Sequence, residues 1–437
     1  MQKADTIIEN GLIITLDEQA QVIENGAVAV IGSKIAAVGT QEEIASGYSA
    51  GTTISAGDHM VMPGLINAHT HISMTLLRGI ADDLVLEAFL DRVWEAEGKY
   101  MDPPTVRLGA ELAICEMIRG GTTFAQDMYW HPDASAEAAL SAGFRLMNGP
   151  IFVDFEGADH TPSDQREEQA RKFLDKFTEE ELIHASLMPH GTYTVSPHLL
   201  ETIKSLMDEY NVPLHTHASE TEFEVATVRE RYNETPVSQL DRFGMLQQTT
   251  TLAHGVHLTP EDIQLLAERG SSVVHCPVSN LKTAAGFAPL PDLKEAGVPV
   301  LLGTDGTSSS NDLDMWKVMR FAAILARSEL GDPTFNPALD VVRMATTDAA
   351  NAMGLGDMLG SLEAGKYADL ILIELNKPHL TPLFDVYSQM VYAVGREDIS
   401  DVFIHGKAVM RNHEVLTLDE NWIMHQARLK AHEIAAS

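Results

Sequence analysis

Two histidines separated by one residue follow a short apolar segment near the start of the chain. His69 and His71, in the sequence NAHTHI, come directly after VMPGLI. Side chains of an extended segment alternate between its two faces, so both imidazoles point to the same side. Two imidazoles on one face can bind one metal ion, and the pair therefore predicts half of a metal site.

Most of the later apolar segments also end in histidine or aspartate. The eight segments are residues 61–67, 122–127, 144–152, 182–190, 212–217, 249–254, 271–276 and 298–305, and the polar residues at their ends are His69 and His71, Asp127, His190, His217, His254, His275 and Asp305. A single histidine on an apolar strand is commonly a satisfied core residue. A whole set at strand ends is far less expected by chance, so we interpret these residues together as one site.

The remaining ligands of the metal site are expected from this set. Catalytic zinc-type sites use about three or four nitrogen and oxygen ligands and keep one position open for water. His217 and Asp305 are the natural partners of His69 and His71. Ligands without thiolate suit zinc, iron or manganese, and Cys276 is interpreted as a packing residue.

A site of this kind predicts hydrolysis. A bound divalent ion makes water a nucleophile near neutral pH, and the reaction then needs a group that moves protons. Glu220, three residues after His217 in HTHASE, is the candidate general acid and base. His254 is expected to orient or deprotonate the water, and Asp305 to bind metal and relay a proton. The alternatives are a solvated helix-start role for Glu220 and a packing role for His254.

The segments that carry these residues predict the fold. Their hydrophobicity is continuous rather than alternating, which is typical of strands buried on both faces of a parallel sheet, and helix-like stretches follow most of them. Eight such units within residues 58–365 predict an α/β fold, a (β/α)8 TIM barrel whose loops after the strands form the active face. A doubly wound open sheet is the competing architecture.

The two ends of the chain predict a second, smaller domain. Residues 1–57 alternate short β-type segments with turns, and residues 366–437 repeat that style in YADLILIEL and DVFIHGKAVMRN before a terminal helix. Neither end has enough strands for an independent sheet. The two ends are therefore expected to pair in a small β-sandwich beside the barrel.

Composition excludes several classes of partner. The chain has 437 residues, 45% of them hydrophobic, and a formal net charge of -33, which disfavours nucleic acid and anionic membrane surfaces. No apolar run approaches the roughly 20 residues that cross a bilayer, and Met1 to Glu9 lack the features of a signal peptide. Only two cysteines, Cys115 and Cys276, are present, so a cytoplasmic protein is expected.

The motifs resemble the amidohydrolase superfamily over nearly the full chain, within its mononuclear branch of deaminases and dechlorinases. PGLINAHTHISMTLLRG is similar to the branch's first metal segment, HTHASE to its third-histidine and acid segment, LAHGVHL to its next histidine segment, HCPVSNLKTAAGFAPL to a signature stretch and LLGTDGTSSSN to its aspartate segment. The family also carries a split β domain. The fourth run ends in MPHGTY, without the bridging lysine of binuclear members, so one divalent ion per chain is expected, zinc first and iron or manganese as alternatives.

The closest resemblance within the branch is to deaminases of 5'-methylthioadenosine and S-adenosylhomocysteine. It implies that hydroxide attacks C6 of the adenine ring, that Glu220 protonates N1, and that ammonia leaves with a proton relayed through Asp305 or Glu220. The product is the inosine-type compound. 5'-Deoxyadenosine, adenosine, guanine, cytosine and triazines are the alternative substrates of this metal apparatus.

The same resemblance implies substrate contacts. It maps roles in ribose binding to His190 and to Glu97 in VWEAEGK, with Glu95 as the alternative, while Arg145 and Arg78 are candidates for binding a substrate carboxylate. A homo-oligomer, dimer or tetramer, is expected. A catalytically silent oligomeric scaffold is the alternative of a different class, and the complete set of predicted ligands disfavours it.

Overall fold

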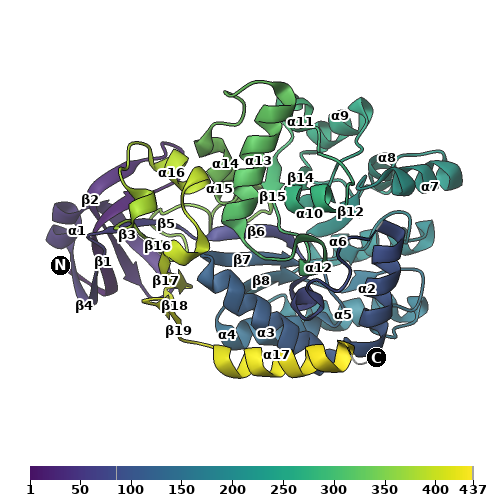
Figure 1. The fold of residues 1–437 in the computed structure, drawn as a ribbon, viewed down its shortest axis with the longest axis horizontal. Coiled ribbons are helices and arrows are strands. Elements are labelled where there is room, and N and C mark those ends of the chain that lie inside the picture. Colours follow the sequence, from purple (N-terminus) through teal and green to yellow (C-terminus); the bar gives the residue numbers. More distant parts are fainter. Residues whose placement is uncertain (85, 436–437) are drawn as a thin grey trace.

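The protein consists of a mixed α/β domain of the TIM-barrel type and a β-sheet built from both ends of the chain (Figure 1). The structure is a computed structural model that describes residues 1–84 and 86–435. In Figure 1 the terminal sheet, purple and yellow-green, lies beside the barrel domain, whose colours run from blue to green.

Each of the eight predicted apolar runs contains a strand of the barrel domain. The strands are β6 (Leu65–Thr70), β7 (Thr122–Asp127), β8 (Arg145–Asn148), β9 (Ile151–Phe152), β10 (Ile183–Ala185), β11 (Met188–Pro189), β12 (Leu214–Ala218), β13 (Thr250–His254), β14 (Ser272–His275) and β15 (Val300–Leu302). The third and fourth runs are each split into two short strands. All pairings between these strands are parallel, as the continuous apolar pattern predicted.

Neighbouring strands follow the order of the sequence. One sheet has the order β10-β8-β7-β6, another has β12-β13-β14-β15, and β9 pairs with β11. A parallel bridge between Leu187 and Leu214 connects the fourth run to β12. At the other side, the Asp305 backbone amide donates to the His69 carbonyl at 3.0 Å. Sequential order without a reversal point disfavours the doubly wound alternative.

The close approach of the last strand segment to the first one requires a glycine. A Cβ atom placed on Gly303 would lie 2.9 Å from the Cβ, N and O atoms of His69. The Asn67 side chain donates to the Thr304 hydroxyl at 2.8 Å and accepts from the Thr304 amide at 3.0 Å, which fixes the same contact. These contacts determine where His69 lies relative to Asp305.

Several helices of the barrel domain begin with the same local signal. Ser196, Thr235 and Thr259 are N-cap residues whose side chains accept from a backbone amide in the first turn, and a proline follows each of them. Proline suits the first helical position because its missing N–H would have no partner there. The caps begin α6 (Pro197–Tyr210), α8 (Pro236–Arg242) and α9 (Pro260–Arg269), which follow barrel strands.

The remaining helices lie around the barrel strands, except α1, which packs on the terminal sheet. They are α1 (Gln41–Gly47), α2 (Leu86–Tyr100), α3 (Pro103–Arg119), α4 (Pro132–Ala142), α5 (Arg166–Phe177), α7 (Glu222–Tyr232), α10 (Pro277–Lys282), α11 (Leu290–Ala296), α12 (Thr307–Ser310), α13 (Met315–Leu330), α14 (Ala338–Met344), α15 (Thr347–Ala352), α16 (Val386–Tyr392) and α17 (Glu420–Ala435). A 3-10 helix, Ile72–Leu77, directly follows His71. The terminal helix α17 runs beside α3, and Arg119 of α3 forms an ion pair with Glu420 (Figure 1).

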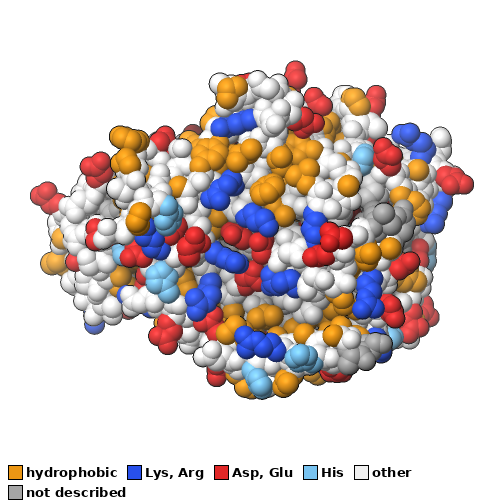
Figure 2. Space-filling model, in the orientation of Figure 1, with side chains coloured by type: hydrophobic (Ala, Val, Ile, Leu, Met, Phe, Trp, Pro, Cys, Tyr) orange, Lys and Arg blue, Asp and Glu red, His pale blue; other side chains and the backbone are white. Residues whose placement is uncertain are grey.

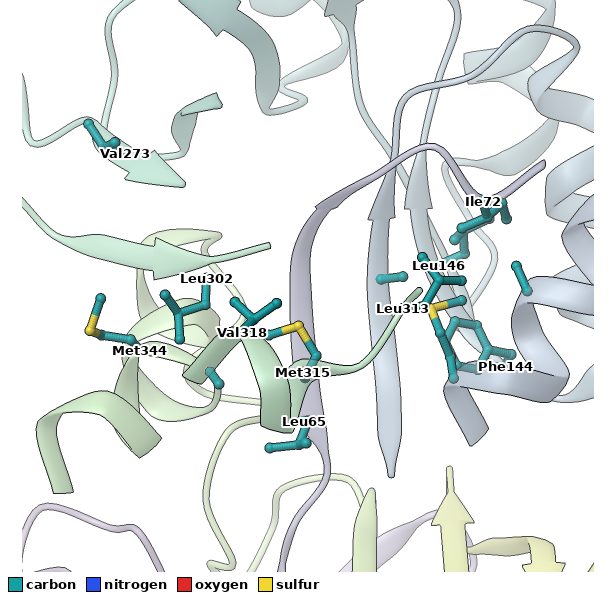
Figure 3. Close-up of a cluster of buried hydrophobic side chains, with 14 of the residues drawn as sticks. Leu65, Ile72, Phe144, Leu146, Val273, Leu302, Leu313, Met315, Val318 and Met344 are labelled. Atoms are coloured by element: carbon teal, nitrogen blue, oxygen red, sulfur yellow. The ribbon is translucent and has the colours of Figure 1, made fainter. Parts of the chain in front are cut away.

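The largest hydrophobic core lies between the barrel strands and the helices around them. Figure 3 shows part of it, with Leu302 of β15 close to Val318 of α13 and Met344 of α14. All three side chains are buried. Burial of a leucine, valine or methionine side chain contributes about 1.5–3 kcal/mol each, so this interface holds the strand ends in place.

Both ends of the chain form one hydrogen-bonded sheet of nine strands. They are β1 (Gln2–Ile14), β2 (Val22–Ile31), β3 (Lys34–Thr40), β4 (Tyr48–Ser55), β5 (His59–Pro63), β16 (Leu370–Glu374), β17 (Ile399–Ile404), β18 (Lys407–Arg411) and β19 (Glu414–Val415). The two ends meet where β5 pairs antiparallel with β16. The prediction that the ends pair with each other is confirmed.

Strand β5 corrects one predicted boundary. The prediction ended the first part of the terminal domain at residue 57, but β5 pairs with β1 and β16 and so belongs to the terminal sheet. This sheet therefore extends to Pro63, and the barrel strands begin at Leu65. The apolar run 61–67 hid the boundary because Gly64 separates two strands of similar hydrophobicity.

The charged side chains on the surface and the apolar character of the helices bear on the classes of partner considered above. On the face shown in Figure 2, acidic and basic side chains are intermingled. Within residues 1–84 and 86–435, no helix combines the length and the apolar character needed to cross a bilayer.

A buried ion pair connects the barrel to the terminal sheet. Arg145, the first residue of β8, donates to both carboxylate oxygens of Asp369, at 2.9 and 3.2 Å, just before β16. It also donates to the Glu181 carbonyl at 2.7 Å, and its guanidinium lies 4.6 Å from the centre of the Tyr367 ring. The side chains of Arg145 and Asp369 are 0% and 3% exposed.

Removing the acidic partner of this pair should destabilise the protein. In Asp369→Ala the Arg145 guanidinium stays buried without the carboxylate that neutralises it, and such a loss costs about 3–5 kcal/mol. We expect that decrease in the free energy of unfolding, measured by urea denaturation. As a control, Glu95→Ala removes a partner that is 71% exposed in the pair with Arg92, and should change stability by no more than about 1 kcal/mol. Equal effects of the two variants would contradict a stabilising role of the buried pair.

Candidate active site

The polar residues predicted from strand ends gather at one end of the barrel strands. His69 lies near the end of β6 and His71 directly after it, His217 lies in β12, His254 ends β13, and Asp305 follows β15. All of them are buried or nearly so. In this fold type the carboxyl ends of the strands carry the chemistry.

The ring nitrogens and the Asp305 carboxylate converge on one point. Asp305 Oδ1 lies 3.4 Å from His69 Nε2 and 3.2 Å from His71 Nε2, and His71 Nε2 lies 3.4 Å from His217 Nε2. The ligand atoms of His69, His71 and Asp305 lie within 4.8 Å of one another, as do those of His69, His217 and His254. The two groups share His69.

Backbone carbonyls hold two of these rings in position. The His71 Nδ1 atom lies 2.5 Å from the Met128 carbonyl, and the His217 Nδ1 atom lies 2.7 Å from the His190 carbonyl. A carbonyl can only accept, so Nδ1 carries the proton in both rings and Nε2 presents a lone pair to the centre of the cluster. This is the arrangement that metal-ligating histidines have.

A second histidine holds the third ring. His69 Nδ1 lies 2.8 Å from His215 Nε2, and His215 Nδ1 lies 2.7 Å from the Thr251 hydroxyl. With the His215 proton on Nδ1, His215 Nε2 accepts from His69, and His69 Nε2 is left with no hydrogen-bond partner. A buried nitrogen in this position is suited to a cation. The sequence analysis missed His215, although its spacing from His217 repeats that of His69 and His71.

Polar groups hold the carboxylate of Asp305. Its Oδ2 accepts from the hydroxyls of Ser279, at 2.5 Å, and Ser309, at 2.9 Å, and its Oδ1 accepts from the Gly306 amide at 2.7 Å. Burial favours the neutral acid, but the neighbouring imidazoles of His69 and His71 outweigh it and hold the pKa of Asp305 well below its usual range. Asp305 therefore stays negatively charged at the floor of the site.

Burial and the negative charge of Asp305 also shift the pKa values of the histidines. Burial lowers the pKa of His69 to about 3 and the pKa of His217 well below its usual value, so both rings are neutral. Burial also acts against a charge on His71, but the hydrogen bond and negative charge of Asp305 raise its pKa to about 9. The positive charge that Asp305 favours at this point is one that a divalent cation can provide.

Residues at the strand ends have an uncommon backbone conformation. Ser219, His254 and Asp305 have φ angles of 54°, 76° and 61°. Few non-glycine residues occupy this left-handed region, and such residues cluster at active sites. The conformation turns each chain away from its strand.

Two acidic residues and an amide surround His254. Glu220 Oε2 lies 3.8 Å from His254 Nε2, and the Glu220 side chain is 25% exposed. His254 Nδ1 donates to the Asn280 side-chain oxygen at 2.8 Å, which directs Nε2 toward Glu220. The buried Glu224 carboxylate accepts from the amides of Ser219 and Glu220, at 3.1 and 2.8 Å, and so fixes the backbone that carries Glu220.

Burial favours the protonated form of Glu220. Desolvation raises its pKa above the usual value, and the charge of Asp305 acts in the same direction while that of His254 opposes it. Burial lowers the pKa of His254, but the charges of Glu220 and Asp305 outweigh burial and raise it. Because both pKa values are raised, the carboxyl and the imidazole can each hold a proton, which suits general acid and base catalysis.

A cavity of about 330 Å3 opens above this cluster. His71, His217, Glu220, His254 and Asp305 contribute to its wall. The other polar lining residues include Glu97, His190, Ser279, Thr283 and Ser309, and the apolar ones include Met74, Trp94, Met128, Tyr129, Ile151 and Phe155. This volume suits a small organic ligand whose polar groups reach the cluster.

Glu97 and His190 line the cavity, as predicted for substrate contacts. Glu97 is 3% exposed and accepts from the Trp130 indole at 3.1 Å. Its other oxygen has no hydrogen-bond partner of good geometry among the described residues, and the Tyr129 hydroxyl lies close to the carboxylate. Burial raises the pKa of Glu97. The alternative, Glu95, is 71% exposed and lies outside the cavity lining.

The prediction that Arg145 binds a substrate carboxylate is wrong. Arg145 begins β8 and therefore lies at the opposite end of the strand from the site, where Asp369 neutralises it. Arg78 does not line the cavity either, because it forms an ion pair with Glu116 and donates to the Asn311 carbonyl. Arg145 already stood at the beginning of the predicted run 144–152, and the rule that places the chemistry at the ends of strands disfavours that position.

Three other residues at strand ends have supporting positions. Asp127 accepts from the Ile72 amide at 2.8 Å and so fixes the chain just after His71. The buried His275 ring packs edge-on against Phe287 at 4.7 Å and lies outside the cavity lining. Cys276 is fully buried in an apolar cluster, in agreement with the packing role predicted for it.

The donor set fits a divalent metal ion. His69, His71, His217 and Asp305 provide three imidazole nitrogens and one carboxylate oxygen, and His69 Nε2 is buried with no hydrogen-bond partner among the described residues. Nitrogen and oxygen donors without thiolate suit zinc, and also iron or manganese.

Comparisons with known proteins agree with this chemistry. The sequence profile of the Amidohydrolase family matches residues 60–409. The "5-methylthioadenosine/S-adenosylhomocysteine deaminase" of Syntrophobacter fumaroxidans is 41% identical over 433 residues, covering 99% of each chain. The "5'-deoxyadenosine deaminase" of Methanosarcina mazei is 38% identical, also over 99% of each chain. A crystal structure described as an adenosine deaminase from Xanthomonas campestris with bound zinc has a TM-score of 0.97 at 39% identity and covers 100% of both chains.

Replacement of one ligand should remove the metal. In general, loss of a hydrogen-bond partner of a metal ligand lowers metal affinity about 10–100-fold, and loss of the ligand itself should cost more. We therefore expect His217→Ala to lose zinc on dialysis, measured as zinc content per chain. His190→Ala is the matched control, because it lines the same cavity and keeps the carbonyl that accepts from His217. Equal zinc retention in the two variants would contradict the assignment of His217.

Proposed function

Because the chain belongs to the Amidohydrolase family, we propose that it is a metal-dependent hydrolytic deaminase that converts an adenosine-type nucleoside to the inosine-type product and ammonia. The observation that carries this proposal is the position of Glu220. Its carboxyl faces His254 at the wall of a cavity whose floor is formed by a metal-type donor set. The substrates in the relatives' names favour 5'-methylthioadenosine, S-adenosylhomocysteine and 5'-deoxyadenosine over guanine, cytosine or a triazine.

We propose one divalent ion per chain, most simply zinc, held by His69, His71, His217 and Asp305. The bound zinc in the Xanthomonas campestris structure supports this choice. Such an ion supplies the Lewis acidity that makes water a nucleophile at neutral pH. Every ligand ring is already held by a hydrogen bond at Nδ1, so the site needs little reorganisation to accept the ion.

The protein's own residues move the protons of the reaction. His254 Nε2 and the Glu220 carboxyl face the same space and can take a proton from the attacking water. The oxygen of that water bonds to C6 of the adenine ring as Glu220 delivers a proton to N1. The bond between C6 and the exocyclic nitrogen then breaks, and ammonia leaves with the second proton of the water, relayed through Asp305 or Glu220.

The cavity supports a role for Glu97 and His190 in ribose binding. The free oxygen of Glu97 can accept a hydrogen bond from a ribose hydroxyl, and His190, whose ring lies 4.9 Å from that of His217, borders the same space. Burial lowers the pKa of His190 to about 4, so the ring is a neutral donor or acceptor. A buried diol needs both kinds of partner.

Several features of the architecture are also proposals. We propose that the eight barrel strands close, on the basis of the hydrogen bonds from Asp305 to His69 and between Asn67 and Thr304. We propose that the terminal sheet folds over as a β-sandwich, because residues of β1 and β2 share one buried cluster with residues of β16 and β17. This divides the chain into residues 1–63, 64–365 and 366–437.

The assembly and the location of the protein remain predictions. A homo-oligomer is expected from the resemblance to enzymes of this type. Both cysteines, Cys115 and Cys276, are free and buried, which fits the predicted cytoplasmic location.

Replacement of the Glu220 carboxyl group by an amide should stop turnover and leave the metal bound. Glu220→Gln keeps the shape of the side chain but cannot transfer a proton, so the rate of ammonia release from 5'-methylthioadenosine should fall by about 100- to 10,000-fold. Zinc content per chain should not change. Glu222→Gln, on the exposed first turn of α7, is the control and should keep normal activity. Near-normal turnover of Glu220→Gln would remove this residue from the mechanism.

A further inference from the structure

We infer that the cavity selects adenosine-type nucleosides whose 5' substituent carries no carboxylate, and that it disfavours S-adenosylhomocysteine against 5'-methylthioadenosine. This inference rests on the proposed function and concerns the part of the cavity away from the donor set. It comes from the side chains that line the mouth and from the charges that the lining provides.

The mouth of the cavity is aromatic. Trp94, Phe155 and Phe223 line it and are 40%, 44% and 64% exposed, whereas the donor set at the floor is buried. The ring centres of Trp94 and Phe155 lie 6.3 Å apart. Large exposed aromatic side chains at the edge of a cavity provide an apolar surface for a ligand. A thioether sulfur makes favourable contacts with such rings.

The lining provides no cation for a carboxylate. Among the described residues that line the cavity, none is lysine or arginine, whereas five are acidic, namely Asp91, Glu97, Glu220, Glu224 and Asp305. A divalent metal ion at the floor would face the adenine end of the substrate and would not be available to the carboxylate. The α-ammonium group of S-adenosylhomocysteine can pair with Asp91, but its carboxylate would meet aromatic rings and this same acidic residue, an environment that is unfavourable for a second negative charge.

Three cations on elements that border the cavity have other partners and are not part of its lining. On α2, Arg92 pairs with Glu95 at 3.7 Å. On α10, Lys282 pairs with Asp82 at 2.6 Å. On α7, Arg231 donates to the Tyr193 carbonyl at 2.8 Å.

The buried Arg166 lies behind Trp130 and pairs with Asp159, with side chains that are 1% and 3% exposed. It also forms no part of the cavity lining. Arg145 and Arg78 lie outside the cavity as well. None of the cations named here is therefore in the cavity lining, where it could bind a substrate carboxylate.

Four substrates separate the effect of charge from the effect of size. They are 5'-methylthioadenosine, 5'-butylthioadenosine, the 5'-(3-aminopropylthio) analogue and S-adenosylhomocysteine, whose last three side chains are of similar length. We expect kcat/KM for S-adenosylhomocysteine to be at least about tenfold below that for each of the other three, measured by ammonia release from zinc-loaded protein. The amino analogue should be turned over well because Asp91 can pair with its ammonium group.

The outcomes distinguish this inference from the proposed function. Ammonia from none of the four substrates would contradict the proposed function itself. Turnover of S-adenosylhomocysteine equal to that of 5'-methylthioadenosine would leave the proposed function intact and overturn the inference. Equally slow turnover of the butylthio compound would also overturn it, because size and not charge would then be decisive.

A cation introduced at the mouth should weaken the discrimination. Phe223→Arg places a guanidinium at an exposed position of the lining, and we expect it to raise the ratio of kcat/KM for S-adenosylhomocysteine over 5'-methylthioadenosine by about fivefold or more. Phe223→Gln is the matched control, because it removes the same ring and adds no charge. An equal change of the ratio in both variants would contradict the inference.

Discussion

The site depends on how the Nδ1 atoms of its histidines are held. A main-chain carbonyl accepts from His71 and another from His217, and His215 accepts from His69. Each of these bonds fixes the proton on Nδ1 and turns the Nε2 atom toward the centre of the cluster. Without them the imidazoles could rotate or change tautomer, and the donor atoms would not converge.

The fold supplies these partners from neighbouring strands. The Met128 carbonyl follows β7, next to β6, and the His190 carbonyl follows β11, next to β12. Parallel strands end at the same edge, so a carbonyl beyond one strand can reach a ring at the end of the next. The terminal sheet stabilises this edge from a distance, because the Arg145–Asp369 pair ties the beginning of β8 to β16.

The sequence predicted the parts of this arrangement that are local. Continuous apolar runs predicted the eight parallel strands, and polar residues at their ends predicted the convergent cluster. The contacts between side chains of different strands and helices could not be predicted. In the sequence, His215 resembles other histidines of apolar strands, and Glu224 resembles a surface residue of α7, but the structure places His215 against His69 and Glu224 against the backbone of Glu220. Arg145 was misassigned because the Asp369 that neutralises it is far along the chain, although its place at the beginning of the run 144–152 already disfavoured a role at the strand ends.

The most direct test of the central claim is to measure ammonia release from 5'-methylthioadenosine by the zinc-loaded protein, after chelation, and after zinc is returned, with metal content determined on each sample. We expect activity to disappear with the metal and to return in proportion to its occupancy, to a maximum at about one ion per chain, because three imidazoles and one carboxylate form a single donor set. Undiminished activity in metal-free protein would contradict it. So would a fully occupied site that releases no ammonia from any adenosine-type nucleoside.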